Sequence, residues 1–260
     1  MSVLTDIADF LFPRFCVMCG ERIASQEKGC VCSVCLMNLP RTGYHLLEHS
    51  PLEKLCWGVV PVERAVSFFY YSTSEVKDGI RSLKYFGKPD VALHLARVYA
   101  DELRLESSFF DGVTAIIPVP LHWMRSMGRG YNQSDCIARG ISEVTGIPVR
   151  KDIVGRKRNN VSQTKVRRTE RRTNVSGVFK LKKRSLKDCG LEGVDKPHFL
   201  IVDDVVTTGS TLISCAQELM KLGDIRVSLL TLAAAGGRTP VPAAENDAPD
   251  TSVFGIPLIE

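Results

Sequence analysis

The order of apolar segments along this 260-residue chain predicts an α/β fold in which a mainly parallel sheet is flanked by helices. Two observations support the prediction. From residue 65 onward, runs rich in β-branched and aromatic residues alternate with segments whose apolar residues recur at helical spacing. Five of the nine cysteines lie between residues 16 and 35, which sets a small cysteine-rich module apart from the α/β part.

The expected elements are assigned from their periodicity and from the residues that flank them. Strands are predicted at residues 65–71, 112–120, 177–181, 198–204 and 225–233. Helices are predicted at residues 74–87, 90–105, 132–146 and 210–222. A short amphipathic helix is also expected near the N-terminus, with Leu4, Ile7, Ala8 and Leu11 on one face.

These elements divide the chain into four segments. They are a cysteine-rich module at residues 1–40, an extended linker at 41–64, the α/β domain at 65–235 and a flexible tail at 236–260. The linker is expected to be extended because Pro51 and Pro61 prevent a long helix there.

Composition indicates a soluble globular protein, with 44% hydrophobic and 24% charged residues. No apolar run approaches the roughly 20 residues that a membrane-spanning helix needs. Residues 1–15 lack the basic start and the unbroken apolar core of a signal peptide. We therefore expect a cytoplasmic protein with reduced thiols, in which paired cysteines indicate metal binding rather than disulfide bonds.

Positive charge is concentrated in residues 150–187, which hold 15 Lys or Arg residues and two acids, although the whole chain carries a net charge of only +5. Such a segment needs an anionic partner or continuous contact with solvent. It is therefore either a mobile lid that closes over a phosphate ligand or a solvated loop without a ligand.

The most informative stretch is FLIVDDVVTTGSTL, residues 199–212. A buried strand here ends at Asp203 and Asp204, and carboxylates at such a position are costly unless something binds them. The next turn leads into a helix whose first amides have no acceptor within the helix, and such amides bind phosphate groups. Gly209 would let the backbone approach the anion closely. The stretch therefore predicts a ligand with both a phosphate and hydroxyl groups, such as a ribose 5-phosphate.

Two alternatives exist for this stretch. Asp and Thr residues commonly cap helices, but two adjacent acids and four hydroxyl residues exceed what one cap needs. Response-regulator receiver domains also have paired acids after a strand, but there the pair lies near the start of the domain. Here the pair lies in the last quarter of the chain and no later Asp ends a strand, which excludes a receiver domain.

The segment IVDDVVTTGST resembles, over its whole length, the phosphoribosyl-pyrophosphate (PRPP) signature of type I phosphoribosyltransferases. The resemblance implies that Asp203 and Asp204 hold the ribose 2- and 3-hydroxyls. It also implies that the 5-phosphate is held by Thr207, Thr208, Gly209, Ser210 and Thr211. Mg²⁺ is expected with PRPP, because this ion takes few protein ligands and binds the phosphates of the substrate.

The segment IIPVPLHWMRSMGRGYNQS, residues 116–134, is the second informative stretch. A strand ends at paired prolines, and the basic loop that follows can bring Arg125 and Arg129 to a pyrophosphate. Asn132 and Gln133 then open a helix beside this loop. A solvated surface loop is the alternative reading of the basic part.

Together these stretches resemble the competence protein F family, in which an N-terminal zinc ribbon precedes a type I phosphoribosyltransferase domain. The motifs LKYFGK, IIPVPLH, RGYNQS, SQTKVRRTERRTNVSGVF and VDDVVTTGST carry the resemblance. It implies a type I phosphoribosyltransferase fold for residues 65–235. It places Lys84 near the pyrophosphate, and it assigns to a flexible substrate-binding loop Gln163, Thr164, Arg168, Arg171 and Asn174.

The cysteine module has the spacing of a structural zinc site. Cys16 and Cys19 form one Cys-x2-Cys pair, and Cys32 and Cys35 form another after 12 intervening residues. Cys30 competes with Cys32 as a ligand, but only Cys32 preserves the spacing. The alternative is a metal-free thiol cluster. Many relatives carry a second ribbon, for which His45, His49 and Cys56 are poorly spaced here.

The sequence favours an enzyme, a phosphoribosyltransferase with an unidentified acceptor. Its chemistry needs positioning and charge stabilisation rather than a protein nucleophile. Glutamine amidotransferase activity is not supported, because Met1 is not followed by the cysteine that would act as N-terminal nucleophile.

The alternative is a protein that handles single-stranded DNA during DNA uptake in competence and keeps the PRPP fold as a sensor or a relic. Its basic segment favours this function, but residues 150–178 contain no aromatic residue on which bases would stack. A transcriptional regulator is disfavoured by the lack of a helix-turn-helix segment. Whether the chain forms homo-oligomers is left open.

Overall fold

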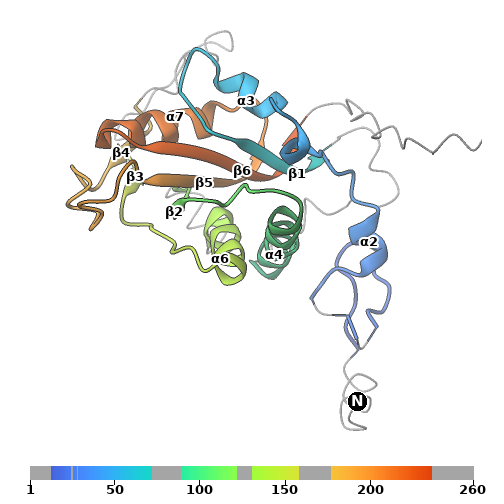
Figure 1. Ribbon diagram of the computed structural model, residues 1–260. Coiled ribbons are helices and arrows are strands. Elements are labelled where there is room, and N and C mark those ends of the chain that lie inside the picture. The colour runs from blue at the N-terminus through green and yellow to red at the C-terminus, as the bar shows by residue number, and fades with distance from the viewer. Residues whose placement is uncertain are drawn as a thin grey trace, which may run out of the picture.

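The computed structural model describes residues 13–24, 26–27, 29–71, 89–121, 131–157 and 177–235. Four strands form one parallel sheet in the order β1-β6-β5-β2 (Figure 1). These strands are β1 Ala65–Tyr71, β2 Val113–Pro118, β5 His198–Val206 and β6 Arg226–Ala235. Two short strands, β3 Val154–Arg156 and β4 Phe179–Leu181, form a separate antiparallel pair.

Helices cover both faces of the parallel sheet (Figure 1). On one face, α4 (Pro89–Glu106) packs beside α6 (Gln133–Thr145). On the other face lie α3 (Pro51–Cys56) and α7 (Ser210–Leu219), which continues into the 3₁₀ turn η3 (Met220–Leu222). The predicted α/β class, a mainly parallel sheet flanked by helices, is therefore confirmed.

Strand β5 is the buried centre of the sheet. It pairs in parallel with β2 on one side and with β6 on the other. Its residues Phe199, Leu200, Ile201 and Val202 are completely buried. A strand covered on both faces needs a continuous apolar run rather than an alternating pattern, which is what this sequence supplies.

Residues 41–64 do not form the extended linker that the sequence predicts. The 3₁₀ turn η1 (Tyr44–Leu46) and helix α3 lie in this segment, and Leu52 and Cys56 are buried in the core. Pro51 starts α3, at a position where the missing N–H costs nothing, and Ser50 and Glu53 form a capping box. The expected extended conformation is therefore wrong, while the domain boundaries remain a prediction.

The cysteine-rich module projects from the α/β domain beside α4 (Figure 1). It contains the short helix α2 (Ser33–Met37) and a small apolar core that includes Ile23 and Val31. Gly29 touches the His94 ring of α4 so closely that no Cβ would fit there. The module is thus in contact with the α/β domain.

The other predicted strands and helices that fall within the described residues are confirmed, with small differences at their ends. Strand β5 continues two residues beyond the acid pair, and the last turn of the 210–222 helix is the 3₁₀ turn η3. Strand β3 was not predicted. The expected helices at residues 74–87 and near the N-terminus, and the tail at 236–260, lie outside the described residues. No described helix is long and apolar enough to cross a lipid bilayer.

Gly140 allows α6 to approach α4 closely. A Cβ there would lie 2.6 Å from the Leu93 carbonyl oxygen and 2.9 Å from the Ala96 Cβ. We expect Gly140→Ala to lower the free energy of unfolding by about 1–3 kcal/mol, because it overpacks this contact. Urea denaturation measures the change. Arg139→Ala at the exposed neighbouring position is the control, and a loss as large as that of Gly140→Ala would contradict the packing argument.

Candidate functional site

The acid pair lies at the carboxyl end of β5, and local donors orient both carboxylates. The Ser134 hydroxyl donates to Asp203 Oδ1 over 2.9 Å, and the Asp204 backbone N–H donates to the same oxygen over 2.9 Å. Asp204 Oδ1 accepts from the Val205 N–H over 2.8 Å. Both acids are half-buried. Asp203 is therefore held by an element far away in the sequence, because Ser134 belongs to α6.

The environment of Asp203 disfavours its negative charge. Burial and the neighbouring carboxylate of Asp204 raise the pKa of Asp203 to about 7, although hydrogen bonds from the Asp204 N–H and Ser134 act in the opposite direction. Two carboxylates in one partly buried place are difficult to ionise together. A cation, or a ligand that donates hydrogen bonds, would favour the charged form of Asp203.

The turn after β5 forms a hollow at the start of α7. Asp203 and residues 205–212 line this hollow, which is open to solvent. The N-cap residue of α7 is Gly209, with φ 72° and ψ −8°. Because glycine has no side chain, no side-chain hydrogen bond from the N-cap residue caps the helix. Only glycine adopts this backbone conformation without strain. The first amides of α7 therefore have no side-chain cap, which disfavours the alternative that Asp and Thr residues merely cap the helix.

The predicted phosphate-binding residues all line this hollow, and their hydroxyls lie at different depths. Thr207 and Thr208 are exposed, whereas Ser210 and Thr211 are half-buried. The hydroxyls of Thr208 and Ser210 are 2.9 Å apart. The arrangement combines backbone donors, hydroxyl groups and the Asp203 carboxylate in one hollow, a donor and acceptor set suited to a phosphate beside hydroxyls. Asp204 is not among the residues that line it.

The start of α6 lies next to the acid pair. Asn132 precedes the helix, and its side-chain amide donates to the Val119 carbonyl over 3.1 Å and to Asp135 Oδ1 over 2.9 Å. Gln133 is the buried first residue of the helix. The Asn132 amide is thus engaged in holding the turn, and Ser134 is the side chain that reaches the acid. Ser134 was not predicted as a site residue from the sequence, although it ends the motif RGYNQS.

Several predicted site residues lie outside the described residues: Lys84, Arg125, Arg129, Gln163, Thr164, Arg168, Arg171 and Asn174. The β3–β4 pair holds together the chain on either side of residues 158–176, since the Lys157 N–H donates to the Val178 carbonyl over 2.9 Å. The residues that flank the predicted basic loop on its two sides therefore lie next to each other.

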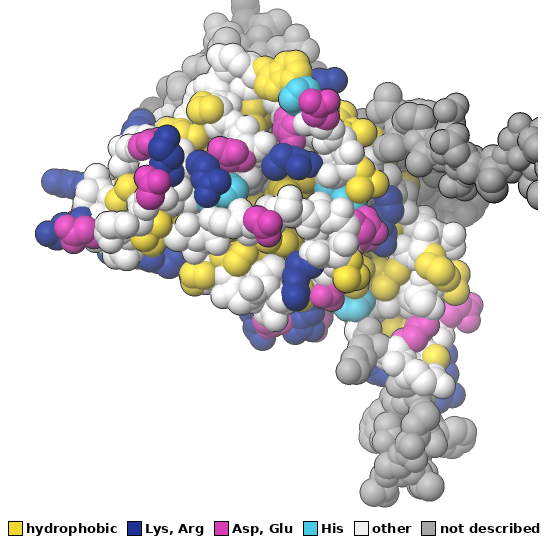
Figure 2. Space-filling model, in the orientation of Figure 1, with side chains coloured by type: hydrophobic (Ala, Val, Ile, Leu, Met, Phe, Trp, Pro, Cys, Tyr) yellow, Lys and Arg dark blue, Asp and Glu magenta, His cyan; other side chains and the backbone are white. Residues whose placement is uncertain are grey.

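Some of the basic residues near this loop already have acidic partners. Arg150 donates twice to Asp152, over 2.8 and 2.9 Å, and Lys151 Nζ lies 2.7 Å from Asp135 Oδ2. On the face shown in Figure 2, Lys and Arg side chains are interspersed with acids over the described part of the chain. An anion-binding role for the basic segment therefore depends on residues other than Arg150 and Lys151.

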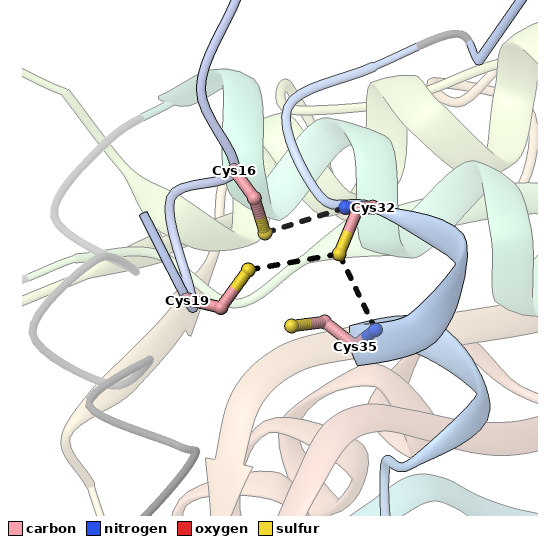
Figure 3. Close-up of side chains that lie close together, drawn as sticks. All are labelled: Cys16, Cys19, Cys32 and Cys35. Atoms are coloured by element: carbon pink, nitrogen blue, oxygen red, sulfur yellow. Dashed lines mark hydrogen bonds between the residues drawn. The ribbon is translucent and has the colours of Figure 1, made fainter. Parts of the chain in front are cut away.

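The four predicted zinc ligands lie together in the cysteine module. Cys16, Cys19, Cys32 and Cys35 point toward one another (Figure 3), and their four sulfur atoms all lie within 4.8 Å of one another. Cys30, the competing candidate, is not part of this group. The chemistry of four sulfur donors from two knuckles fits a tetrahedral Zn²⁺ ion, as the spacing predicts.

Backbone N–H groups donate to two of the four sulfur atoms, those of Cys16 and Cys32. The N–H groups of Met18 and Cys32 donate to Cys16 Sγ over 3.4 and 3.3 Å, and the Cys35 N–H donates to Cys32 Sγ over 3.5 Å. Burial disfavours the Cys16 thiolate, but the N–H groups of Cys19, Cys32 and Met18 outweigh it and lower the pKa of Cys16 to about 7. Since zinc binds thiolates, a lowered pKa favours metal binding.

Comparison with known proteins finds relatives that span most of the chain. No family model matches. The chain is 28% identical to DNA utilization protein YhgH of Salmonella typhimurium over 230 residues, covering 85% of this chain and 96% of that protein. It is 36% identical to competence protein F of Haemophilus influenzae over 126 residues, covering 46% and 50%. Competence protein ComFC of Bacillus subtilis is 24% identical over 210 residues, covering 81% and 73%.

Solved structures show weaker similarity. The glutamine PRPP amidotransferase from B. subtilis is 19% identical with a TM-score of 0.36, covering 55% of this chain and 26% of that chain. Adenine phosphoribosyltransferase from Leishmania tarentolae is 11% identical with a TM-score of 0.34, covering 72% and 93%. Likenesses of this size carry no argument about the site.

We expect the full chain to release one zinc ion when its thiols are modified by a mercurial reagent, as measured with a chromogenic chelator. Cys35→Ser should abolish this release and lower the melting temperature, because three sulfur ligands hold zinc less firmly. Cys30→Ser is the matched control in the same module, and it should retain the ion. Equal loss of zinc from both variants would contradict the assigned ligands.

The raised pKa of Asp203 predicts a pH-dependent stability. The folded state keeps a proton between about pH 4 and pH 7 that the unfolded state releases, because the ordinary pKa is 3.8 and the folded one about 7. The free energy of unfolding should therefore fall as pH rises through this range, by at most about 1.4 kcal/mol per unit. Asp203→Asn should flatten this dependence in urea denaturation.

Asp152→Asn is the matched control for this measurement. Hydrogen bonds from Arg150 lower the pKa of Asp152 to about 2, so its contribution is lost only in more acidic solution. This variant should keep the fall in stability between pH 4 and pH 7. An Asp203→Asn protein that keeps the same fall would refute the account of Asp203.

Proposed function

This chain belongs to the competence protein F family, and from that premise we propose that it binds PRPP, or a related ribose 5-phosphate, together with Mg²⁺. The observation that carries the proposal is the hollow at the carboxyl end of β5, which Asp203 and the uncapped start of α7 line together. A phosphate needs hydrogen-bond donors, and ribose hydroxyls need acceptors. The hollow offers both within one turn of chain.

Each part of the ligand has a proposed partner. The 5-phosphate accepts from the first amides of α7 and from hydroxyls of the turn at residues 207–211, where Gly209 permits close approach. The carboxylates of Asp203 and Asp204 accept from the ribose hydroxyls. Mg²⁺ is held mainly by the pyrophosphate oxygens, and its charge favours the ionised form of Asp203.

The reaction that we propose is transfer of the phosphoribosyl group to a nitrogen acceptor. The bond between ribose C1 and the pyrophosphate oxygen breaks, and the pyrophosphate leaves with the bonding electrons. The acceptor nitrogen bonds to C1 through its lone pair and then releases its proton to solvent. Positioning and charge stabilisation suffice for such a step. The proposed partners of the pyrophosphate are Lys84, Arg125, Arg129, Arg168 and Arg171. We propose that the basic loop closes over the site as a lid.

The relatives favour a second candidate function. Their names refer to DNA utilization and to competence. We propose as the alternative that the chain handles single-stranded DNA in DNA uptake, with the phosphoribosyltransferase fold kept as a sensor or a relic. The excess of Lys and Arg in residues 150–187 suits the phosphates of a single strand.

Isothermal titration of the full chain tests PRPP binding. We expect saturable heat with PRPP that requires Mg²⁺. Asp203→Asn should weaken binding at least about tenfold, roughly 1.4 kcal/mol, because a charged acceptor is lost. Asp152→Asn is the control and should bind as the wild type does. The absence of heat at millimolar PRPP would contradict the proposal.

Fluorescence anisotropy with a labelled single-stranded oligonucleotide separates the two functions. Binding that weakens steeply with salt, persists in Asp203→Asn and is unaffected by PRPP would support an independent DNA-handling function. Competition by PRPP would instead place the strand in the same hollow. No binding at low salt would contradict the second function.

A further inference from the structure

A second group of metal-ligating side chains lies apart from both the acid pair and the cysteine module. His45 belongs to η1, whereas Glu102 and Glu106 lie one turn apart on α4. Each offers one ligand atom, and the three atoms lie within 4.8 Å of one another. His45 Nε2 is 2.7 Å from Glu106 Oε2. The tertiary structure has therefore brought one imidazole to two carboxylates from a distant helix.

The imidazole of His45 is fixed in place before any ligand binds. Its side chain is only 4% exposed. Arg64 Nη2 donates to the His45 carbonyl over 2.9 Å, and the ring meets the Tyr99 ring edge-on with 6.3 Å between centroids. A ligand that is rigidly held loses little conformational entropy when it binds a metal ion.

The hydroxyl of Tyr99 is an independent indication that a ligand belongs here. Tyr99 lies on the same face of α4, three residues before Glu102. It is 1% exposed, and its hydroxyl has no hydrogen-bond partner within the described part of the chain. Its ring meets the His45 ring edge-on, which places Tyr99 directly beside the group. A buried hydroxyl left unpaired is costly, so a hydrogen-bonding partner is expected beside it.

The charges around the group favour a cation. Two carboxylates lie near one guanidinium, that of Arg41, whose Nε donates to Glu102 Oε2 over 3.0 Å. The Arg41 guanidinium also stacks over the Phe68 ring at 4.1 Å. The side chain of Glu106 is 49% exposed, so an ion from solvent can reach the group.

We propose that His45, Glu102 and Glu106 bind a divalent transition-metal ion of the zinc type. One imidazole and two carboxylates are ligands that zinc accepts, and water completes the coordination. A water molecule on the ion also provides a partner for the Tyr99 hydroxyl. When the metal ion binds, Glu102 gives up its ion pair with Arg41 and coordinates the ion instead. The ion joins η1 to the end of α4 and so fastens the 41–64 segment to the α/β domain.

Cobalt(II) distinguishes this site from the cysteine module in the intact protein. Cobalt bound by thiolates gives intense charge-transfer absorption, whereas cobalt bound by nitrogen and oxygen gives only weak d–d bands. We expect titration of the metal-free full chain to fill two sites, the second without thiolate absorption. Glu106→Gln should weaken the second site at least tenfold and leave the thiolate absorption unchanged.

Glu143→Gln is the matched control, because Glu143 is also a helical glutamate paired with arginine side chains, Arg97 and Arg139. It should leave both cobalt sites unchanged. Arg41→Gln should tighten the second site, since the guanidinium no longer competes for Glu102. If Glu106→Gln does not fold, as judged by circular dichroism, His45→Asn replaces it.

Two results would overturn the proposal. One is a single cobalt site per wild-type chain, with the thiolate spectrum only. The other is a second site whose affinity does not change in Glu106→Gln or His45→Asn. In either case His45, Arg41 and the two glutamates form an ion-pair network that holds η1 against α4 without a metal.

Discussion

The burial of β5 between β2 and β6 is the constraint on which the candidate site depends. The strand is hydrogen-bonded on both edges and covered by helices on both faces, so its register cannot slip without moving the acid pair into the apolar interior. This holds Asp203 and the first turn of α7 at the carboxyl end of the sheet. In parallel sheets that end is where ligands bind, because loops and helix starts converge there.

The same burial makes the site costly for the free protein. Asp203 sits beside a second acid, and Ser134 and one backbone amide only partly compensate for the lost solvation of its carboxylate. A group with a pKa raised in this way is typical of functional sites, because a ligand that neutralises it recovers the lost free energy. In the proposed function, stability and ligand binding are therefore opposed at Asp203, and a ligand in the hollow beside it would relieve the cost.

The segments N-terminal to β1 combine apolar packing with polar and sulfur contacts. In the cysteine module, four sulfur atoms converge and backbone amides donate to two of them. Between this module and β1, the buried Glu53 accepts from the Ala65 N–H, and His45 meets Glu106. Residues 41–64 are thus tied to the sheet and to α4, and they carry the module on a fixed base rather than on a loose connection.

Local patterns in the sequence determined much of this protein. The apolar run before Asp203, the glycine and hydroxyl residues after it, and the two Cys-x2-Cys pairs each depend on neighbours a few residues away, so the strand, the turn and the sulfur ligands were predictable. The helix α4 was predictable because Val91, Leu95, Tyr99 and Leu103 recur every four residues. The short elements η1, α3 and β3 were not, since three to six residues carry no reliable period.

Only the tertiary structure decided which distant residues meet. Ser134 reaches Asp203 across 69 positions, and His45 reaches Glu106 across 61. These contacts follow from the strand order β1-β6-β5-β2 and from the packing of α4 beside α6, which depends on one glycine without a side chain. Strand order is set by the combined burial of all the elements, and no local run of residues specifies it.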